Sequence, residues 1–145
     1  MIVIGCDHGA FELKTVLIEH LKSLGKEVVD CGCYDTKSVD YPDIAEKVCA
    51  EVNTGNYEFG ILLCGTGIGI SMAANKIDGI RCALLSNEFS ARMTRQHNNA
   101  NVIAMGGRVV GPELAKSIVN AYMSAEFEGG RHQARIDKIH ALENK

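Results

Sequence analysis

The sequence predicts an α/β fold in which one parallel sheet is covered by helices on both faces. Short apolar or β-branched runs alternate with amphipathic helical segments along the whole chain, which is the pattern of successive βαβ units. One of these runs, EFGILLC at 58–64, is apolar almost without a break, as expected for a strand buried on both faces. Because the 145 residues include no linker, internal repeat or low-complexity segment, we expect a single domain spanning 1–145.

Five strands and six helices are expected. The strands are short runs that end at glycine or polar residues. They cover residues 1–6, 26–32, 58–64, 80–86 and 101–107. The helices are indicated by apolar residues at helical spacing, and Pro42 and Pro112 stand near the start of two of them. They cover residues 11–24, 41–53, 67–76, 87–98, 112–125 and 131–143.

Composition excludes several classes of protein. The net charge of −3 gives no sign of a basic surface that would bind nucleic acid or an anionic membrane. The first residues, MIVIGCDHGAFELK, have no basic region, and no run approaches the ~18 apolar residues of a membrane span, so we expect neither a signal peptide nor an anchor. Six cysteines without a secretory signal indicate reduced thiols in a cytoplasmic protein. Cys31 and Cys33 form C-x-C, which we interpret as small residues at a strand end rather than a metal site.

A loop rich in glycine follows the third strand. Cys64 ends that strand, and Gly65, Gly67 and Gly69 follow at alternate positions. Free N–H groups between a strand and a helix can cradle an oxyanion, although glycines can also simply make a tight turn. Ligands of parallel sheets bind at the carboxyl ends of the strands. We therefore expect GCDHGA, CGTGIG and GGRVVG, which follow three different strands, to lie along one edge.

Three familiar anion sites do not fit this loop. A Walker loop needs a lysine that is absent, and the G-x-G-x-G spacing departs from the G-x-G-x-x-G of dinucleotide sites. A cysteine phosphatase loop would place an arginine six residues after Cys64, where Ile70 stands. The loop could therefore cradle an oxyanion, but it matches neither the usual nucleotide-binding loops nor a phosphatase loop.

Cys64 itself is a candidate base. A helix N-terminus can lower the pKa of a thiol that precedes it. The thiolate could then attack a carbon or take a proton from one. If it takes a proton from a carbon next to a carbonyl, the neighbouring N–H groups would stabilise the enolate oxygen. Cys49 and Cys82 carry no such signal and are interpreted as small apolar core residues.

Further polar residues are expected to join this edge. Asp7 and His8 follow the first strand and suit sugar hydroxyls or a phosphate, although Asp7 could equally cap the next helix. His97, in the segment RQHNNAN, suits acid–base chemistry near neutral pH, or is simply a helix-end residue. Arg131 and Arg135 share a helix face and could bind a phosphate, or form a solvated basic face. Arg108 is a third candidate for the anion.

Taken together, these segments resemble the type B ribose-5-phosphate isomerases, whose relatives act on allose 6-phosphate and galactose 6-phosphate. The resemblance rests on segments that occur in the same order over nearly the whole chain. They are GCDHGAFELK, DYPDIA, LLCGTGIGIS, RQHNNANVIAMGGRVVG and the pair Arg131 and Arg135. It implies a three-layer, Rossmann-like α/β/α sandwich with a five-stranded parallel sheet. It also implies aldose–ketose isomerisation through an enediolate without a metal or organic cofactor.

The resemblance further implies roles for single residues. Cys64 would be the base that moves the proton between C2 and C1, and His97 would open the sugar ring with help from Asp7. The remaining residues would hold the substrate. The enediolate would be held by Gly65, Thr66, Gly67, Ile68 and Gly69, the phosphate by His8, Arg131 and Arg135, and other parts of the sugar by Asn98 and Arg108.

The resemblance implies an assembly as well. Family members are dimers or tetramers of dimers whose active sites lie at the dimer interface and contain residues from both chains. The helix at 131–143 is therefore expected to pack on a partner subunit. Sugar length stays open between five and six carbons. A sugar-phosphate or nucleotide binding module without turnover, and a cysteine phosphocarrier, are the alternatives outside isomerisation.

Overall fold

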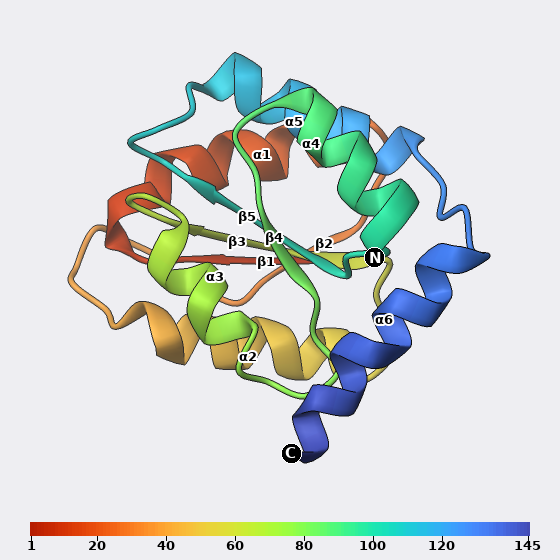
Figure 1. The fold of residues 1–145 in the computed structure, drawn as a ribbon. Helices are drawn as coiled ribbons and strands as arrows, with labels where there is room; N and C mark the ends of the chain where they lie inside the picture. The colour runs from red at the N-terminus through yellow and green to blue at the C-terminus, as the bar shows by residue number, and fades with distance from the viewer.

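The computed structural model describes all residues, 1–145, as one parallel sheet between two layers of helices (Figure 1). The sheet has five strands in the order β2-β1-β3-β5-β4, and every neighbouring pair is parallel. The strands are β1 (Ile2–Cys6), β2 (Val28–Asp30), β3 (Phe59–Cys64), β4 (Cys82–Leu84) and β5 (Val102–Gly106). The predicted fold class is therefore confirmed.

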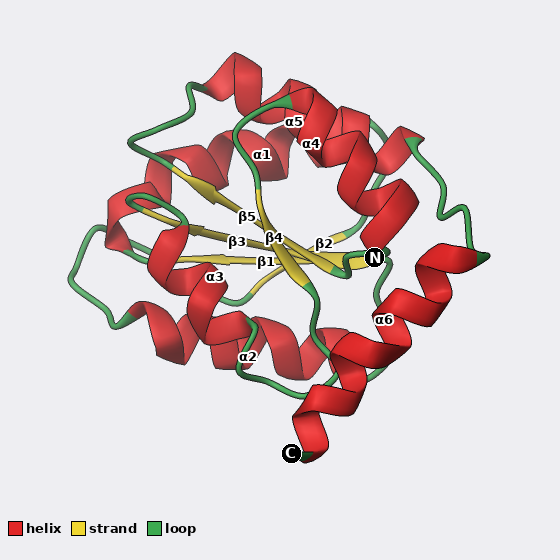
Figure 2. Ribbon diagram, in the orientation of Figure 1, coloured by secondary structure: helices red, strands yellow, loops and turns green.

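Six α-helices surround the sheet (Figure 2). They are α1 (Phe11–Ser23), α2 (Tyr41–Asn53), α3 (Ile68–Ala74), α4 (Glu88–Met93), α5 (Pro112–Ser124) and α6 (Arg131–Ala141). Helices α1, α4 and α5 cover one face, α2 and α3 cover the other, and α6 lies outside the sandwich beyond one end of the strands (Figure 1). Three single turns complete the structure. They are η1 (His8–Ala10), the π-helical turn η2 (Thr94–Asn98) and η3 (Leu142–Asn144).

Successive side chains of each strand point to opposite faces of the sheet, and they form two separate apolar cores. In β3, Ile61 and Leu63 belong to the core under α1 and α5, whereas Leu62 and Cys64 belong to the core under α2 and α3. Successive side chains of a strand point to opposite faces, so the register of β3 decides on which side the thiol lies. Cys64 therefore lies on the α2–α3 side, at the carboxyl end of a fully buried strand.

The strand order creates a crevice at one point of the sheet. From β1 the chain continues to β2 on one side, and from β3 it continues to β4 and β5 on the other side. Because β1 and β3 are neighbours, the loops that follow them diverge at the carboxyl edge, which is where open α/β sheets bind their ligands. The segment after β1 and the glycine loop after β3 occupy this position.

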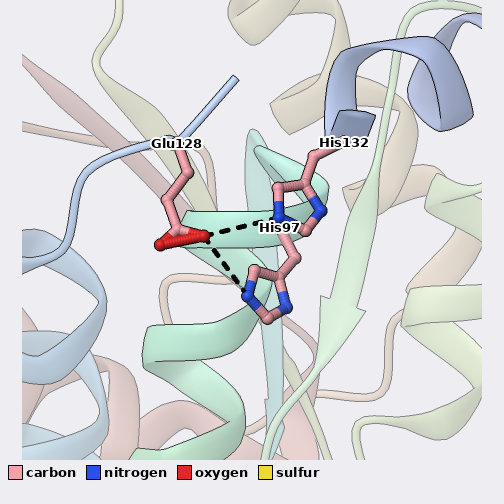
Figure 3. A group of neighbouring side chains, drawn as sticks. All are labelled: His97, Glu128 and His132. Atoms are coloured by element: carbon pink, nitrogen blue, oxygen red, sulfur yellow. Dashed lines mark ion pairs between the residues drawn. The ribbon is translucent and has the colours of Figure 1, made fainter. Parts of the chain in front are cut away.

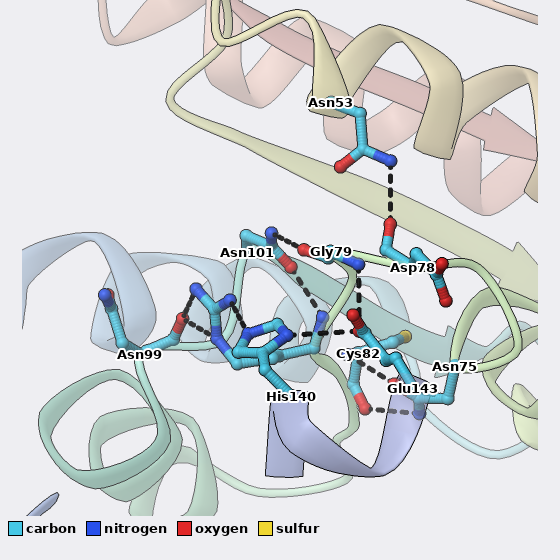
Figure 4. A network of polar contacts seen from close by, with 10 residues as sticks. Asn53, Asn75, Asp78, Gly79, Cys82, Asn99, Asn101, His140 and Glu143 are labelled. Atoms are coloured by element: carbon cyan, nitrogen blue, oxygen red, sulfur yellow. Dashed lines mark hydrogen bonds and ion pairs between the residues drawn. The ribbon is translucent and has the colours of Figure 1, made fainter. Parts of the chain in front are cut away.

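Helix α6 is held at the opposite edge by a polar network (Figure 4). Arg81 donates to the Asn99 carbonyl through Nε and Nη2, at 3.0 and 2.7 Å, and its Nη1 lies 2.8 Å from His140 Nε2. Glu143 Oε1 accepts from the Gly79 N–H at 3.0 Å. Burial lowers the pKa of Arg81. The end of α6 is thus fixed to its own chain, and its packing on a partner subunit stays a prediction.

None of the helices is both long and apolar enough to cross a membrane.

Candidate active site

Backbone hydrogen bonds join three loops at the carboxyl edge of the sheet. The Asp7 N–H donates to the Leu63 carbonyl at 3.0 Å, which ties the end of β1 to the end of β3. The Gly107 N–H donates to the Cys64 carbonyl at 2.8 Å, which ties the loop after β5 to the same place. The expected meeting of GCDHGA, CGTGIG and GGRVVG at one edge is therefore observed.

The glycine loop folds around the sulfur of Cys64. This side chain is 4 % exposed, and its Sγ accepts a hydrogen bond from the Gly67 N–H at 3.1 Å. The Ile68 N–H donates to Thr66 Oγ1 at 3.2 Å, which shapes the turn that leads into α3. The loop therefore aims a backbone donor directly at the sulfur.

Gly67 fits its position only because it has no side chain. Its φ is +79°, in the left-handed region that favours glycine, and a Cβ there would stand 2.7 Å from the carbonyl carbon of Met105 and 2.9 Å from the Gly106 nitrogen. Both of these atoms belong to the backbone at the end of β5, which cannot move aside as a flexible side chain can. The loop is thereby pressed against β5 with its N–H aimed at Cys64.

Gly67→Ala is expected to damage both stability and catalysis. A residue other than glycine in this conformation costs about 1–3 kcal/mol, and the clash with β5 should displace the N–H that contacts the sulfur. Urea unfolding and steady-state turnover measure the two effects. Gly111→Ala is the matched control, because nothing lies within 4 Å of a Cβ at Gly111. Equal stability and turnover in the two variants would contradict this account of the loop.

Three of the other cysteines have environments that suppress reactivity. Burial, with a contribution from nearby Cys33, raises the pKa of Cys6 to about 12. Burial alone raises the pKa of Cys49 to about 12, and burial also raises that of Cys82. These three side chains stay protonated at neutral pH and act as apolar core residues, as the sequence predicted for Cys49 and Cys82.

Asp7 and His8 both border the crevice. Asp7 Oδ1 accepts from the Gly9 N–H at 2.9 Å and so caps η1, as one of the two interpretations proposed, while its Oδ2 accepts no hydrogen bond within the chain. His8 Nδ1 accepts from the Val39 N–H at 3.3 Å, which leaves Nε2 without a partner in the chain. His8 also lines a hollow of about 160 Å³ beside Gly107. Each residue therefore keeps one polar atom available for a ligand.

Arg108 lies over the glycine loop. Its N–H donates to the Gly65 carbonyl at 3.0 Å, and its Nη1 stands 3.2 Å from the point where a Cβ of Gly65 would be. The guanidinium is exposed and makes no ion pair. It therefore adds a free positive charge next to Cys64 and the loop N–H groups.

The structure places His97 and Asn98 at the opposite edge of the sheet, which corrects the expectation that they join Cys64. Both residues lie in η2, which precedes β5. The Asn101 carbonyl accepts from the Gly60 N–H at 2.9 Å, so this segment adjoins the start of β3, whereas Cys64 is at its end. Four residue steps along a strand span about 13 Å. Residues that precede a strand of a parallel sheet lie at its amino edge, so one chain does not bring these groups together.

Arg131 and Arg135 are also at this amino edge, at the start of α6, and not beside the glycine loop (Figure 1). Both are exposed, and neither forms an ion pair. Asp137, which is near Arg135 in the sequence, accepts instead from Gln133 Nε2 at 2.8 Å. The two arginines therefore remain available for an anion, but within one chain that anion would be far from Cys64.

Two residues that the sequence did not single out surround His97 (Figure 3). Glu128 Oε1 lies 3.5 Å from His97 Nε2 and 3.4 Å from His132 Nε2. The two imidazole rings stack with centroids 4.4 Å apart and an interplanar angle of 12°. The spacing of Glu128 and His132, four residues apart, was the only sequence signal for them. Their meeting with His97 depends on how the α5–α6 connection packs against η2.

Comparison with known proteins places this arrangement in a family. Residues 2–139 match the family model described as Ribose/Galactose Isomerase. The chain is 50% identical over 144 residues to ribose-5-phosphate isomerase B of Escherichia coli (strain K12), covering 99% of this chain and 97% of that protein. It is 44% identical over 146 residues to a D-erythrulose-4-phosphate isomerase of Pectobacterium atrosepticum, covering 99% and 95% of the two chains.

A solved structure agrees with the fold as a whole. The ribose-5-phosphate isomerase B of Clostridium thermocellum superposes with a TM-score of 0.97 at 50% identity, covering 99% of this chain and 97% of that one. The match extends over the glycine loop at one edge of the sheet and the His97 cluster at the other. With its five-stranded parallel sheet and its cysteine–glycine loop, the chain belongs to the ribose/galactose isomerase family.

Proposed function

We propose that this protein is an aldose–ketose isomerase that interconverts D-ribose 5-phosphate and D-ribulose 5-phosphate. The observation that carries the proposal is the sulfur of Cys64, held at the end of a buried strand by the Gly67 N–H at 3.1 Å. A base next to several N–H donors suits proton abstraction beside a carbonyl, because the same loop stabilises the oxyanion that forms. The names of the relatives in E. coli and C. thermocellum support the substrate.

The proposed reaction has two stages. His97, assisted by Asp7, opens the furanose ring by moving a proton from the C1 hydroxyl to the ring oxygen. Cys64 then takes the C2 proton as a thiolate, and the electron pair moves to the carbonyl oxygen to give an enediolate. The N–H groups from Gly65 to Gly69, with the Thr66 hydroxyl, hold that charge. Return of the proton to C1 and transfer of a hydroxyl proton complete the ketose.

The remaining polar residues are proposed to bind the substrate. His8, Arg131 and Arg135 hold the phosphate, for which the two arginines offer charge-assisted hydrogen bonds. Asn98 and Arg108 contact the sugar, and Arg108 is already seated over Gly65. No organic cofactor or metal is assigned a role in this reaction, because the thiolate and the loop together account for its proton transfer.

We infer that two chains build each active site. Cys64 and Asp7 lie at the carboxyl edge, whereas His97 and the two arginines lie at the amino edge, so a second copy must supply one of the two groups. Exposed apolar side chains surround the carboxyl edge and suit a subunit interface. They are Ile68, Met72, Leu84, Phe89 and Val109. A two-fold dimer would build two such sites at once.

A cytoplasmic location is part of the proposal. All six cysteines are free thiols, and even the closest described pair, Cys6 and Cys33, has its sulfur atoms 3.8 Å apart. Free thiols are typical of proteins in reducing compartments.

Incubation with ribose 5-phosphate in D₂O, followed by NMR, tests the function. We expect ribulose 5-phosphate to form and solvent deuterium to appear at the carbon next to its carbonyl. A binding module would bind the sugar phosphate without exchange, and a phosphocarrier would yield a phosphothiol detectable by mass. Either result without isomerisation would overturn the proposal.

Allose 6-phosphate and galactose 6-phosphate, assayed in parallel, address sugar length. The relatives differ in this respect, since the protein from P. atrosepticum is named for a four-carbon substrate. We expect kcat/KM to be highest with the five-carbon sugar. A preference for either six-carbon sugar would leave the chemistry of Cys64 in place and change only the substrate.

A further inference from the structure

Three side chains at the amino edge have the composition and spacing of a metal site. His97 Nε2, Glu128 Oε1 and His132 Nε2 all lie within 4.8 Å of one another. We propose that His97, Glu128 and His132 form a three-ligand site for a divalent transition-metal ion of the zinc class, and that its occupancy inhibits the enzyme reversibly. The inhibition rests on the proposed function of His97, whereas the binding of the metal does not.

The two separations from the Glu128 oxygen match those between ligands of a tetrahedral ion. Zinc bonds to imidazole nitrogen and carboxylate oxygen are about 2.0–2.2 Å long, which places neighbouring ligand atoms of a tetrahedron about 3.3–3.5 Å apart. The Glu128 oxygen is 3.5 Å from one imidazole nitrogen and 3.4 Å from the other. These separations are long for N–H···O hydrogen bonds, which are usually 2.7–3.2 Å. Both imidazoles therefore face one oxygen at a spacing that suits an ion between them.

The fold holds the backbone of Glu128 and buries the side chain of His132. The Glu128 N–H donates to the Gln96 carbonyl at 3.0 Å, which ties the α5–α6 connection to η2 next to His97. The His132 N–H donates to the Gly129 carbonyl at 3.1 Å, and the His132 side chain is only 11 % exposed. The rings are nearly parallel, so His97 must turn about its Cβ–Cγ bond to aim its lone pair at the same ion. Its side chain is 40 % exposed and has room to do so.

The ligand set selects the class of metal. Two imidazoles and one carboxylate suit zinc and its transition-metal neighbours, whereas magnesium and calcium prefer oxygen ligands throughout. Three protein ligands leave a fourth position for water, as in open zinc sites. Neither His97 nor His132 donates its other ring nitrogen to a partner within the chain, and such partners usually add about 10–100-fold in affinity. We therefore expect binding that is moderate and reversible by chelators.

A metal ion bound at this site would interfere with the proposed ring opening. His97 can transfer a proton only while its ring nitrogen is free, and a metal bound to Nε2 removes that lone pair.

Calorimetric titration of the full-length protein with Zn²⁺ tests the site directly. We expect one ion per chain, and we expect Glu128→Gln and His132→Gln each to weaken binding by about tenfold or more, since a ligand contributes at least as much as an outer partner. His20→Gln is the matched control, because His20 is a histidine on α1 whose side chain hydrogen-bonds only to Asn120. Its affinity for zinc should equal that of the wild type.

Cobalt substitution reports which atoms bind. The Co²⁺ spectrum should show visible bands typical of nitrogen and oxygen ligands and no sulfur charge-transfer band, which Cys64 or another thiol would produce. Absence of binding, equal affinity in all four proteins, or a sulfur band would overturn the site.

Turnover separates the metal site from the proposed reaction. Zinc should inhibit the wild type, EDTA should restore its rate, and Glu128→Gln should lose a smaller fraction of its own zinc-free rate at the same zinc concentration. Zinc binding without inhibition would overturn the regulatory role and the role of His97 in ring opening, while the metal site would stand. If the protein binds zinc as expected but has no isomerase activity, the proposed function is wrong and the metal site stands.

Discussion

Cys64→Ala is expected to lose isomerase turnover almost completely while keeping its fold. A positioned acid–base group contributes about 10²–10⁴-fold to a reaction, and no other ionisable side chain is hydrogen-bonded within the glycine loop. Loss of the thiolate should therefore stop both ribulose 5-phosphate formation and deuterium exchange at C2, since the same proton transfer underlies both. NMR in D₂O measures the two rates in one sample.

A second cysteine provides the control for this substitution. Cys49 is fully buried in α2 on the same side of the sheet as Cys64, and burial holds it as a neutral thiol. Cys49→Ala should reduce stability in urea and leave turnover per folded molecule unchanged. If Cys64→Ala retains near wild-type exchange, or if Cys49→Ala loses as much as Cys64→Ala, the assignment of the base is wrong.

Mixed dimers of two inactive variants should recover activity. Cys64→Ala and His97→Asn each remove one half of the proposed site, and the two halves lie at opposite edges of a chain. In a mixed dimer, one site carries both defects and the other carries neither. Random reassortment of an equal mixture makes half of the dimers mixed, so about one quarter of all sites should be intact.

This experiment needs partial unfolding and refolding of the mixture, followed by steady-state turnover. The control mixture combines Cys64→Ala with Cys64→Ser, which damage the same half of the site and should recover nothing. Recovery of about a quarter of the wild-type rate in the first mixture alone supports a shared site. No recovery, with mixed dimers demonstrated by mass, would mean that Cys64 and His97 do not combine across chains.

The sequence predicted the central strands more accurately than the edge strands. The predicted strand 58–64 is observed as Phe59–Cys64, whereas 26–32 and 80–86 shrink to Val28–Asp30 and Cys82–Leu84. Both shortened strands lie at the edges of the sheet and pair on one side only. The apolar pattern of the sequence indicates that a strand forms, but hydrogen bonding to neighbouring strands decides how long it is. The order of the sheet, with β5 between β3 and β4, also depends on long-range pairing that local patterns do not record.

The predicted helix 87–98 also differs from the structure, because local sequence patterns do not record long-range packing. The structure divides it into α4 and the π-helical turn η2, which ends at Asn98 and is followed by Asn99 in the left-handed conformation with φ of 46°. Asparagine tolerates this conformation, and it is frequent in turns. The sequence located the end of the helix, but packing decided that its last turn would widen.

The sequence by itself determined the chemistry at the carboxyl edge. A buried strand that ends in Cys64, followed at once by alternate glycines, fixes a thiol beside free N–H groups, because all of these features are local. Only the tertiary structure decided where the partners of that thiol lie. His97 precedes a strand and Cys64 ends one, so a parallel sheet separates them within one chain. The same long-range packing brings Glu128 and His132 to His97, since the α5–α6 connection is held there by a backbone hydrogen bond to η2.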